Sequence, residues 1–531
     1  MSVYKTPFCF KDIFLILFTF LSIFFVAFNY HSSILHHLTT LSYTIATATA
    51  DATTTKNSPT TVNHLVFSIA SSSKTFSQRK KFLRLWYKPN FTRTYVFLDH
   101  PSSENYNSPE NIDLPPFLIY DDMSRFPYTH GLGARYALGL TYMIKQVVAR
   151  NDSNVRWYIF GDDDTVFIVD NLVKTLQKYD HNEWYYIGSN SESYVQNDYF
   201  SFDMAFGGGG YAVSSPLARV LARVLDSCLM RYPSLYSSDA RIFSCLAELG
   251  VSLTHEPGFH QDDVWGNLFG ILASHPLSPL LSLHHIDDVH SLFPKMTKIQ
   301  ALQHFFKAAN ADPARISQQY ICYDRKNSLS IAVAWGYAVQ VYEGDITVPE
   351  LMTVLRSFES YDKNKRSPYF MFKTKVESRG PCQKMVAFLE SVYSNGDNVW
   401  SNYTRHRVKG KTCKKNGNKI IKNLEEITVF SSKLDIDARQ DGKKGRISPS
   451  LANTENKTSD VIEPLDYRVK FDNPEDVFAR VSQQIKRSQS PGFSVDQSSP
   501  IEDKISTELL DKTKDDIERL LIMSSQDLLL P

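Results

Sequence analysis

Three consecutive aspartates follow an apolar segment in this 531-residue chain. Residues 157–161 read Trp-Tyr-Ile-Phe-Gly, and Asp162, Asp163 and Asp164 come directly after them. Open α/β sheets bind ligands beyond the carboxyl ends of their strands, so a strand here would deliver the carboxylates to a binding site. Carboxylate oxygens suit a hard divalent ion, Mn²⁺ or Mg²⁺, which can neutralise a diphosphate leaving group. The alternative interpretation is an acidic turn that caps a helix beginning near Val166.

A run of four glycines occupies residues 207–210. Glycine lets a ligand approach the backbone closely and permits dihedral angles that other residues avoid. The run therefore indicates a loop that lines a binding cleft, and a flexible turn is the alternative. Ser215 and Pro216 then predict the start of a helix over 217–229.

Paired carboxylates occur again at Asp262 and Asp263. One member of such a pair can act as a general base if its pKa is raised, and a glycosyl transfer that inverts the anomeric centre needs one base. A pair at a helix N-terminus is the alternative. Further along, the adjacent His284 and His285 could complete a metal site begun by the aspartate triplet, although an exposed polar turn would also fit.

The elements expected around these motifs alternate between strands and helices. Apolar runs predict strands over 64–70, 94–99, 115–120 and 156–160, and helical spacing predicts helices over 74–87, 133–150 and 166–179. This alternation is typical of a parallel sheet covered on both faces, so the sequence predicts an α/β domain over 61–300.

The C-terminal part has a different character. Residues 301–425 predict a mostly β appendage, based on a β-rich run at 328–342 and a strand candidate at 369–372. Residues 426–531 are polar and predict a largely disordered tail, with one amphipathic helix over 505–523.

An apolar segment near the N-terminus indicates the compartment. Residues 13–28 carry no charge, Lys5 and Lys11 precede them, and no Lys or Arg follows until Lys56. This pattern predicts a signal-anchor transmembrane helix at 13–28 and a cytoplasmic tail at 1–12. A cleaved signal peptide and a buried core helix are the alternatives. Residues 29–60, rich in Thr, Ala and Ser, predict a flexible stem.

A lumenal chain can be glycosylated and can form disulfides. The acceptor pattern for N-glycosylation occurs at Asn90, Asn151, Asn402 and Asn456. Five cysteines follow the predicted membrane segment, and an odd number leaves at least one thiol without a partner in the same chain.

The overall charge limits which classes of partner the chain is expected to bind. Fifty-eight Lys and Arg residues balance 57 Asp and Glu residues, giving a formal net charge of +1. A nucleic-acid-binding protein needs a basic excess, so this class is not expected.

The motifs, in their order and spacing, resemble the Fringe-like part of glycosyltransferase family 31, most closely its plant Fringe-related branch. The resemblance covers residues 62–300, and residues 301–425 resemble the C-terminal extension of that branch. It implies a single-pass type II Golgi membrane protein with a lumenal catalytic domain of the GT-A type. It also implies a UDP-sugar donor, Mn²⁺ and inversion at the anomeric carbon.

The resemblance also implies roles for individual residues. Asp164 would be the main metal carboxylate, and His284 or, by preference, His285 would be the second protein ligand. Asp263 is the first choice for the base and Asp262 the second. The implied donor-side residues are two carboxylates, two glycines and three arginines: Asp162, Asp163, Gly208, Gly209, Arg79, Arg84 and Arg135.

The leading hypothesis is an inverting, metal-dependent glycosyltransferase. It would move a sugar from a UDP-sugar to a glycan or glycoprotein acceptor and form a β1,3 linkage. The alternative is a non-catalytic Golgi scaffold or glycan-binding protein that retains the fold.

Overall fold

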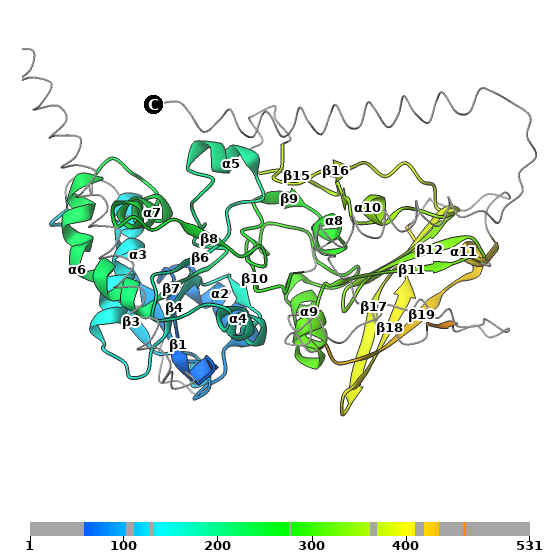
Figure 1. Cartoon of the computed structure of the whole chain (residues 1–531), viewed down its shortest axis with the longest axis horizontal. Helices are drawn as coiled ribbons and strands as arrows, with labels where there is room; N and C mark the ends of the chain where they lie inside the picture. The colour runs from blue at the N-terminus through cyan, green and yellow to red at the C-terminus, as the bar shows by residue number, and fades with distance from the viewer. Residues whose placement is uncertain are drawn as a thin grey trace, which may run out of the picture. The chain divides into compact units, whose positions relative to one another are not determined.

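The computed structural model describes residues 58–101, 111–126, 132–274, 278–325, 327–361, 369–408, 419–434 and 460–462 (Figure 1). The chain divides into two units, Met1–Tyr467 and Arg468–Pro531, and every described residue lies in the first. The predicted cytoplasmic tail, the transmembrane helix at 13–28, nearly all of the stem and the helix at 505–523 lie outside the described residues. No helix within the described ranges has the length and apolar character needed to cross a bilayer.

A seven-stranded mixed sheet organises the first half, in the order β3-β2-β1-β4-β7-β6-β8. Strands β3, β2, β1 and β4 run parallel, whereas β7 is antiparallel to both of its neighbours. The bounds are β1 (Leu65–Ala70), β2 (Thr94–Leu98), β3 (Phe117–Ile119), β4 (Trp157–Asp162), β6 (Tyr186–Gly188), β7 (Tyr211–Ser214) and β8 (Leu253–His255). The predicted α/β class is confirmed, and all four strands predicted from apolar runs lie in the parallel part.

Strand β1 shows why the parallel part is apolar throughout. Leu65, Phe67 and Ile69 belong to one hydrophobic core, and Val66 and Ala70 belong to another. Alternate residues of a strand face opposite sides, so both faces of the sheet are covered. The covering helices include α2 (Phe76–Trp86), α3 (Leu132–Ala149), α4 (Val169–Leu176), α6 (Ser215–Arg231) and α7 (Ser238–Glu248).

Two local predictions were wrong. The helix expected over 166–179 begins at Val169, because Val166 and Phe167 form the short strand β5. Strand β5 pairs antiparallel with β10 (Ser282–Leu283), which places a distant segment beside the aspartate triplet. The strand candidate at 369–372 makes an isolated bridge instead, between Phe370 and Ser193.

A second seven-stranded sheet follows helix α9 (Lys298–Ala311), in the order β11-β12-β13-β17-β18-β19-β20. Its neighbouring strands are antiparallel except for β19 and β20, which are parallel. The bounds are β11 (Gln319–Asp324), β12 (Leu329–Ala334), β13 (Ala338–Glu343), β17 (Lys384–Asn395), β18 (Asn398–Arg405), β19 (Glu426–Ser432) and β20 (Asp460–Ile462). Strand β19 begins one residue past the expected domain boundary at 425, so this sheet continues into the segment predicted to be a tail.

A short strand pairing links the first half of the chain to the segment after residue 301. Strand β15 (Phe358–Ser360) pairs antiparallel with β9 (Val264–Gly266), which directly follows Asp263. Other short elements are η2 (Val62–His64), α5 (Tyr194–Tyr199), α8 (Phe269–Leu272), η4 (Pro313–Arg315), α10 (Val348–Leu351), β14 (Val354–Leu355), β16 (Thr374–Lys375) and α11 (Lys419–Asn423). The chain after residue 301 therefore reaches back to the segment that carries the candidate base.

The cysteines agree with the prediction that an odd number leaves at least one thiol unpaired. Cys228 and Cys245 form a disulfide that joins α6 to α7, and Cys382 is also disulfide-bonded. Cys322 is free and buried, which leaves one thiol without a partner as expected.

Candidate active site

The aspartate triplet lies at the carboxyl end of a parallel strand. Asp162 is the last residue of β4, and Asp163 and Asp164 follow in the turn that leads to β5. Helix α4 begins only at Val169, and the residue that precedes it is Ile168. The alternative interpretation of the triplet as a helix cap is therefore wrong.

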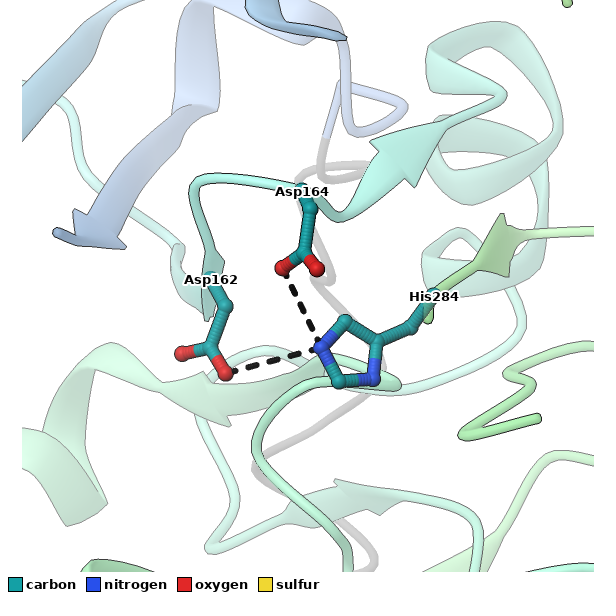
Figure 2. Close-up of side chains that lie close together, drawn as sticks. All are labelled: Asp162, Asp164 and His284. Carbon is teal, nitrogen blue, oxygen red and sulfur yellow. Dashed lines mark ion pairs between the residues drawn. The ribbon is translucent and has the colours of Figure 1, made fainter. Parts of the chain in front are cut away.

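Three side chains converge beside this turn (Figure 2). The Nε2 atom of His284 lies 3.2 Å from Asp164 Oδ1 and 3.6 Å from Asp162 Oδ2. One ligand atom from each of these residues lies within 4.8 Å of the others. Two carboxylate oxygens and one imidazole nitrogen form a donor set that can hold a divalent ion, and the carboxylate oxygens suit Mn²⁺.

A short strand pairing places His284 at this point. Leu283 in β10 pairs with Val166 in β5, so the residue after Leu283 comes next to the turn that ends at Thr165. The Nδ1 atom of His284 lies 3.2 Å from the carbonyl oxygen of Gln261. A carbonyl can only accept a hydrogen bond, so Nδ1 carries the proton and a neutral ring leaves Nε2 free to bind a metal. His284, and not the preferred His285, therefore faces the carboxylates.

Charged neighbours tune Asp164. Burial by itself would raise the pKa of this carboxyl, but the positive charges of His284 and Arg79 outweigh burial and hold its pKa well below its usual range. Arg79 lies 3.3 Å from Asp164 and donates a hydrogen bond of 3.0 Å to Asp163. Asp163 also accepts a hydrogen bond from the Ser71 hydroxyl, at 2.6 Å. Asp164 is therefore held ionised, and Asp163 is occupied by hydrogen bonds from Ser71 and Arg79.

The glycine run approaches the same histidine. A Cβ atom on Gly208 would lie 2.1 Å from His284 Cε1, and one on Gly209 would lie 3.1 Å from the backbone of Gln261. The Gly208 carbonyl accepts a hydrogen bond of 2.7 Å from Thr165. Gly208 therefore has no side chain because the imidazole occupies that space, and this removes the flexible-turn alternative at that position.

We expect Gly208→Ala to displace His284 and to weaken Mn²⁺ binding at least about tenfold, since changes around metal ligands commonly cost ten- to hundredfold in affinity. Gly380→Ala is a matched control, because a Cβ there meets no atom within 4 Å. Binding can be followed by the paramagnetic signal of free Mn²⁺. Equal affinity in the Gly208 and Gly380 variants would contradict the placement of His284.

The two candidate bases have different surroundings. Asp263 accepts a hydrogen bond of 2.6 Å from Ser191 and lies 3.3 Å from the Nδ1 atom of His285. Asp262 is fully buried, has a positive φ of 57°, and its carboxylate accepts the backbone N–H of His284 at 3.3 Å. Burial and the nearby Glu192 raise the pKa of Asp262. Both precede strand β9, so the alternative interpretation as a helix N-terminal pair is wrong.

Glu192 supports the turn that carries these aspartates. Its carboxylate accepts the backbone N–H of Asp262 at 2.7 Å and lies 3.0 Å from His260 Nδ1. Ligand atoms of Glu192, His260 and Asp262 also lie within 4.8 Å of one another. Because both carboxylate oxygens of Glu192 already have partners, we interpret this buried group as a support for the backbone turn.

An aromatic stack unites the two halves of the molecule beside Asp263. The rings of His285 and Tyr361 are 5.4 Å apart with an interplanar angle of 8°, and those of Tyr361 and Trp265 are 5.1 Å apart at 3°. Trp265 also donates a hydrogen bond of 2.6 Å to the Tyr361 carbonyl. His285 thus faces Asp263 and Tyr361, and its ring lies 3.9 Å from that of His284.

We expect Tyr361→Ala to lower the turnover number about tenfold, because the loss of the central ring frees the imidazole beside Asp263. Tyr361→Phe retains the stacked ring and should keep most of the activity. Comparing kcat and KM for the two variants checks this. A phenylalanine variant as impaired as the alanine variant would show that the hydroxyl, not the stack, matters.

The three predicted arginines have different outcomes. Arg79 contacts the triplet, and its expected contact with the donor stays a prediction, whereas Arg84 pairs with Asp113 at 2.8 Å. Arg135 lies in α3, and its side chain is outside the described residues. The prediction that Arg84 faces the donor has no support in these contacts.

Several residues at the site were missed by sequence reasoning. Their hydroxyl, carboxyl and aromatic groups carry no motif of their own, and they reach the site from four separate segments, with Ser191 and Glu192 adjacent. They are Ser71, Ser191, Glu192, Asp239 and Tyr361.

Comparisons with known proteins bear on this site. Residues 196–447 match a family described as "Protein of unknown function, DUF604". The chain is 29% identical over 124 residues to the beta-1,3-glucosyltransferases of Homo sapiens and Mus musculus. The aligned part is 23% of this chain and 24% of each relative, so the chain spans about a quarter of the length of the curated relatives it matches. This similarity to glycosyltransferases supports the expected likeness to family 31, and the plant Fringe-related branch stays a prediction.

Solved structures give low similarity scores. The glycosyltransferase GlyE of Streptococcus pneumoniae has a TM-score of 0.25 at 14% identity, covering 36% of this chain and 45% of that protein. The galactosyltransferase LgtC, in complex with donor and acceptor sugar analogs, has a TM-score of 0.26 at 14% identity, covering 36% and 73%. Scores this low do not by themselves establish a shared fold.

Proposed function

We propose that this protein is an inverting, metal-dependent glycosyltransferase with a GT-A-type catalytic domain. It transfers a sugar from a UDP-sugar to a glycan or glycoprotein acceptor and forms a β1,3 linkage. The observation that carries the proposal is the convergence of Asp162, Asp164 and His284 at the end of β4, with the buried Asp263 nearby. The partial similarity to beta-1,3-glucosyltransferases supports the reaction class.

Each side chain has a definite task in this reaction. Asp162, Asp164 and His284 hold Mn²⁺ or Mg²⁺, which when bound supplies positive charge for the donor diphosphate. Asp263 takes the proton of the acceptor hydroxyl while the oxygen of that hydroxyl bonds to the anomeric carbon. UDP leaves from the opposite face. Ser191 and His285 orient the carboxylate of Asp263. Arg79 neutralises Asp163 and Asp164.

Binding and turnover assays test the proposal. The wild-type protein should bind UDP only when Mn²⁺ is present, and it should hydrolyse at least one UDP-sugar from a panel of the common donors. Calorimetry measures the first property, and release of UDP measures the second. A protein that binds no common nucleotide in the presence of Mn²⁺ would favour the non-catalytic alternative.

Metal binding should also release protons. Burial by itself would lower the pKa of His284, but Asp164 and Asp162 raise it to about 10, so the metal-free ring is protonated at pH 7. A metal ligand must be deprotonated, and burial also raises the pKa of Asp162 to about 7, so we expect more than one proton to leave for each Mn²⁺ bound. Calorimetry in buffers of different ionisation enthalpy counts the protons, and His284→Gln should release about one fewer. Equal proton release by both proteins would exclude His284 as a source.

We also propose that the catalytic domain lies in the Golgi lumen and is anchored by a single type II transmembrane helix. The uncharged segment at 13–28 supports the anchor, and the disulfide between Cys228 and Cys245 supports an oxidising compartment. Protease treatment of intact Golgi vesicles should spare the residues after 60. Digestion of these residues without detergent would contradict this topology.

A further inference from the structure

Exposed aromatic side chains gather on one loop near the candidate active site. Tyr194, Tyr199, Phe200 and Phe202 are between 36% and 72% exposed, and Tyr369 from the C-terminal extension is 65% exposed. The ring of Tyr194 lies 5.5 Å from that of Phe202 and 6.4 Å from that of Tyr369, and Tyr199 lies 4.8 Å from Phe200. We call these five residues the aromatic platform. Clustered apolar exposure of this kind usually marks a binding surface.

The platform is continuous with the candidate active site at both ends of its loop. At one end, Ser191 donates to the carboxylate of Asp263 at 2.6 Å. At the other end, the ring of Phe200 lies 5.9 Å from that of the buried Phe206, the residue before the glycine run. The amide of Phe206 donates to the carbonyl of Ser189 at 3.2 Å, which closes the loop. The loop that carries the platform is therefore anchored beside the proposed base.

The loop is held in shape before any ligand binds. The buried side chain of Asn197 accepts the amide of Ser191 at 3.0 Å and donates to the carbonyls of Ser191, at 2.8 Å, and Ser193, at 3.0 Å. A side chain that uses its donors and its acceptor in this way fixes the backbone on which the aromatic rings are carried. Ligand binding then costs little conformational entropy, because the loop is already ordered.

The C-terminal extension completes the platform. The amide of Tyr194 donates to the carbonyl of Tyr369 at 3.2 Å, and the amide of Met371 donates to the carbonyl of Glu192 at 3.0 Å. Tyr369 and Tyr194 thus lie together because two segments far apart in the sequence are hydrogen-bonded. The extension therefore supplies part of the aromatic platform, a role that is separate from the sugar-transfer step.

The chemistry of the surface selects one class of ligand. Sugar rings present C–H groups on their faces, which pack on aromatic rings, and hydroxyls at their edges, which Tyr and water can bind. Residues 182–215 contain no Lys or Arg, and Asp198 and Asp203 are exposed on this loop. These carboxylates disfavour an acidic glycan on the loop relative to a neutral one, while the nearby cation Arg356 lies 5.9 Å from the ring of Phe370, next to Tyr369.

We propose that the aromatic platform binds a neutral oligosaccharide, which is the acceptor chain. The role as acceptor site rests on the proposed function. The binding of the oligosaccharide does not need donor or metal, so it can be tested separately.

The full chain should be assayed for binding to a panel of neutral oligosaccharides and to sulfated or uronic-acid-containing ones of the same length, without nucleotide or metal. The wild type should bind a neutral member. Tyr199→Ala and Tyr369→Ala should each weaken that binding about tenfold, and the double variant more. Tyr393→Ala is the matched control, because Tyr393 is 55% exposed on strand β17 of the second sheet. Equal melting temperatures would show that the variants fold.

Several outcomes would overturn the inference. These are binding by the double variant as tight as by the wild type, binding of acidic oligosaccharides alone, and the absence of binding to every neutral member. Loss of self-association in the variants, with no effect on glycan binding, would assign the platform to a contact between copies of the chain and would also overturn it. Failure of the proposed function has a different signature, because it appears as a lack of Mn²⁺-dependent UDP binding.

Discussion

Asp164→Asn should lower sugar transfer and donor hydrolysis at least about a hundredfold, together with Mn²⁺-dependent UDP binding. The amide has the size of the carboxylate but no charge, so its oxygen is a much weaker metal ligand than the carboxylate oxygen that lies 3.2 Å from His284 Nε2. It also leaves the nearby Arg79 without one of its two ionic partners. Initial rates of UDP release and calorimetric titration of UDP with Mn²⁺ measure the two effects.

Asp170→Asn is the matched control for this variant. Asp170 is exposed in the first turn of α4, six residues from Asp164, and contacts none of the candidate ligands. Its replacement should leave the activity within about twofold, as expected for a surface substitution. Full activity in the Asp164 variant would exclude this carboxylate as a metal ligand.

Asp263→Asn should reduce the transfer rate about a hundred- to ten-thousandfold, which is the usual contribution of a general base. Metal-dependent UDP binding should survive, because Asp263 is not among the three side chains that converge at the metal position. This separation between binding and chemistry distinguishes the base from a metal ligand. Single-turnover transfer and UDP titration on the same preparation check it.

The second candidate base should behave differently. Asp262 accepts the backbone N–H of His284, so Asp262→Asn should disturb the position of His284 and weaken metal binding. Asp288→Asn is the control, since Asp288 is exposed in the loop after His285. If Asp262→Asn abolished transfer with metal binding intact, while Asp263→Asn stayed active, the roles of the two aspartates would be exchanged.

Local sequence patterns were sufficient for the strands of the parallel sheet and for much of the site. The fully buried strands of a parallel sheet are continuous apolar runs, so β1, β2 and β4 could be recognised without any partner. The aspartates belong to the site because they directly follow such a strand. The glycine run was recognisable as a point of close approach. The sequence did not show that the group approaching Gly208 is the His284 ring.

Contacts between distant segments had to come from the tertiary structure. The rings of the two adjacent histidines lie 3.9 Å apart, but it is His284 whose Nε2 atom pairs with Asp162 and Asp164. The pairing of β10 with β5 and the positive φ of 52° at His285 decide that it is His284. A two-residue strand such as β5 has too few residues to show a period, which is why it was mistaken for the start of a helix.

The sequence by itself determined the α/β class, the aspartate triplet at the end of a strand and the glycine loop, because each depends on residues that are close along the chain. Only the tertiary structure decided which histidine meets Asp164 and which arginine reaches the triplet. It also decided that Tyr361 and Tyr369, from the second half of the chain, lie beside the candidate base and on the aromatic platform. These contacts depend on the packing of segments that are far apart in the sequence, which no local periodicity records.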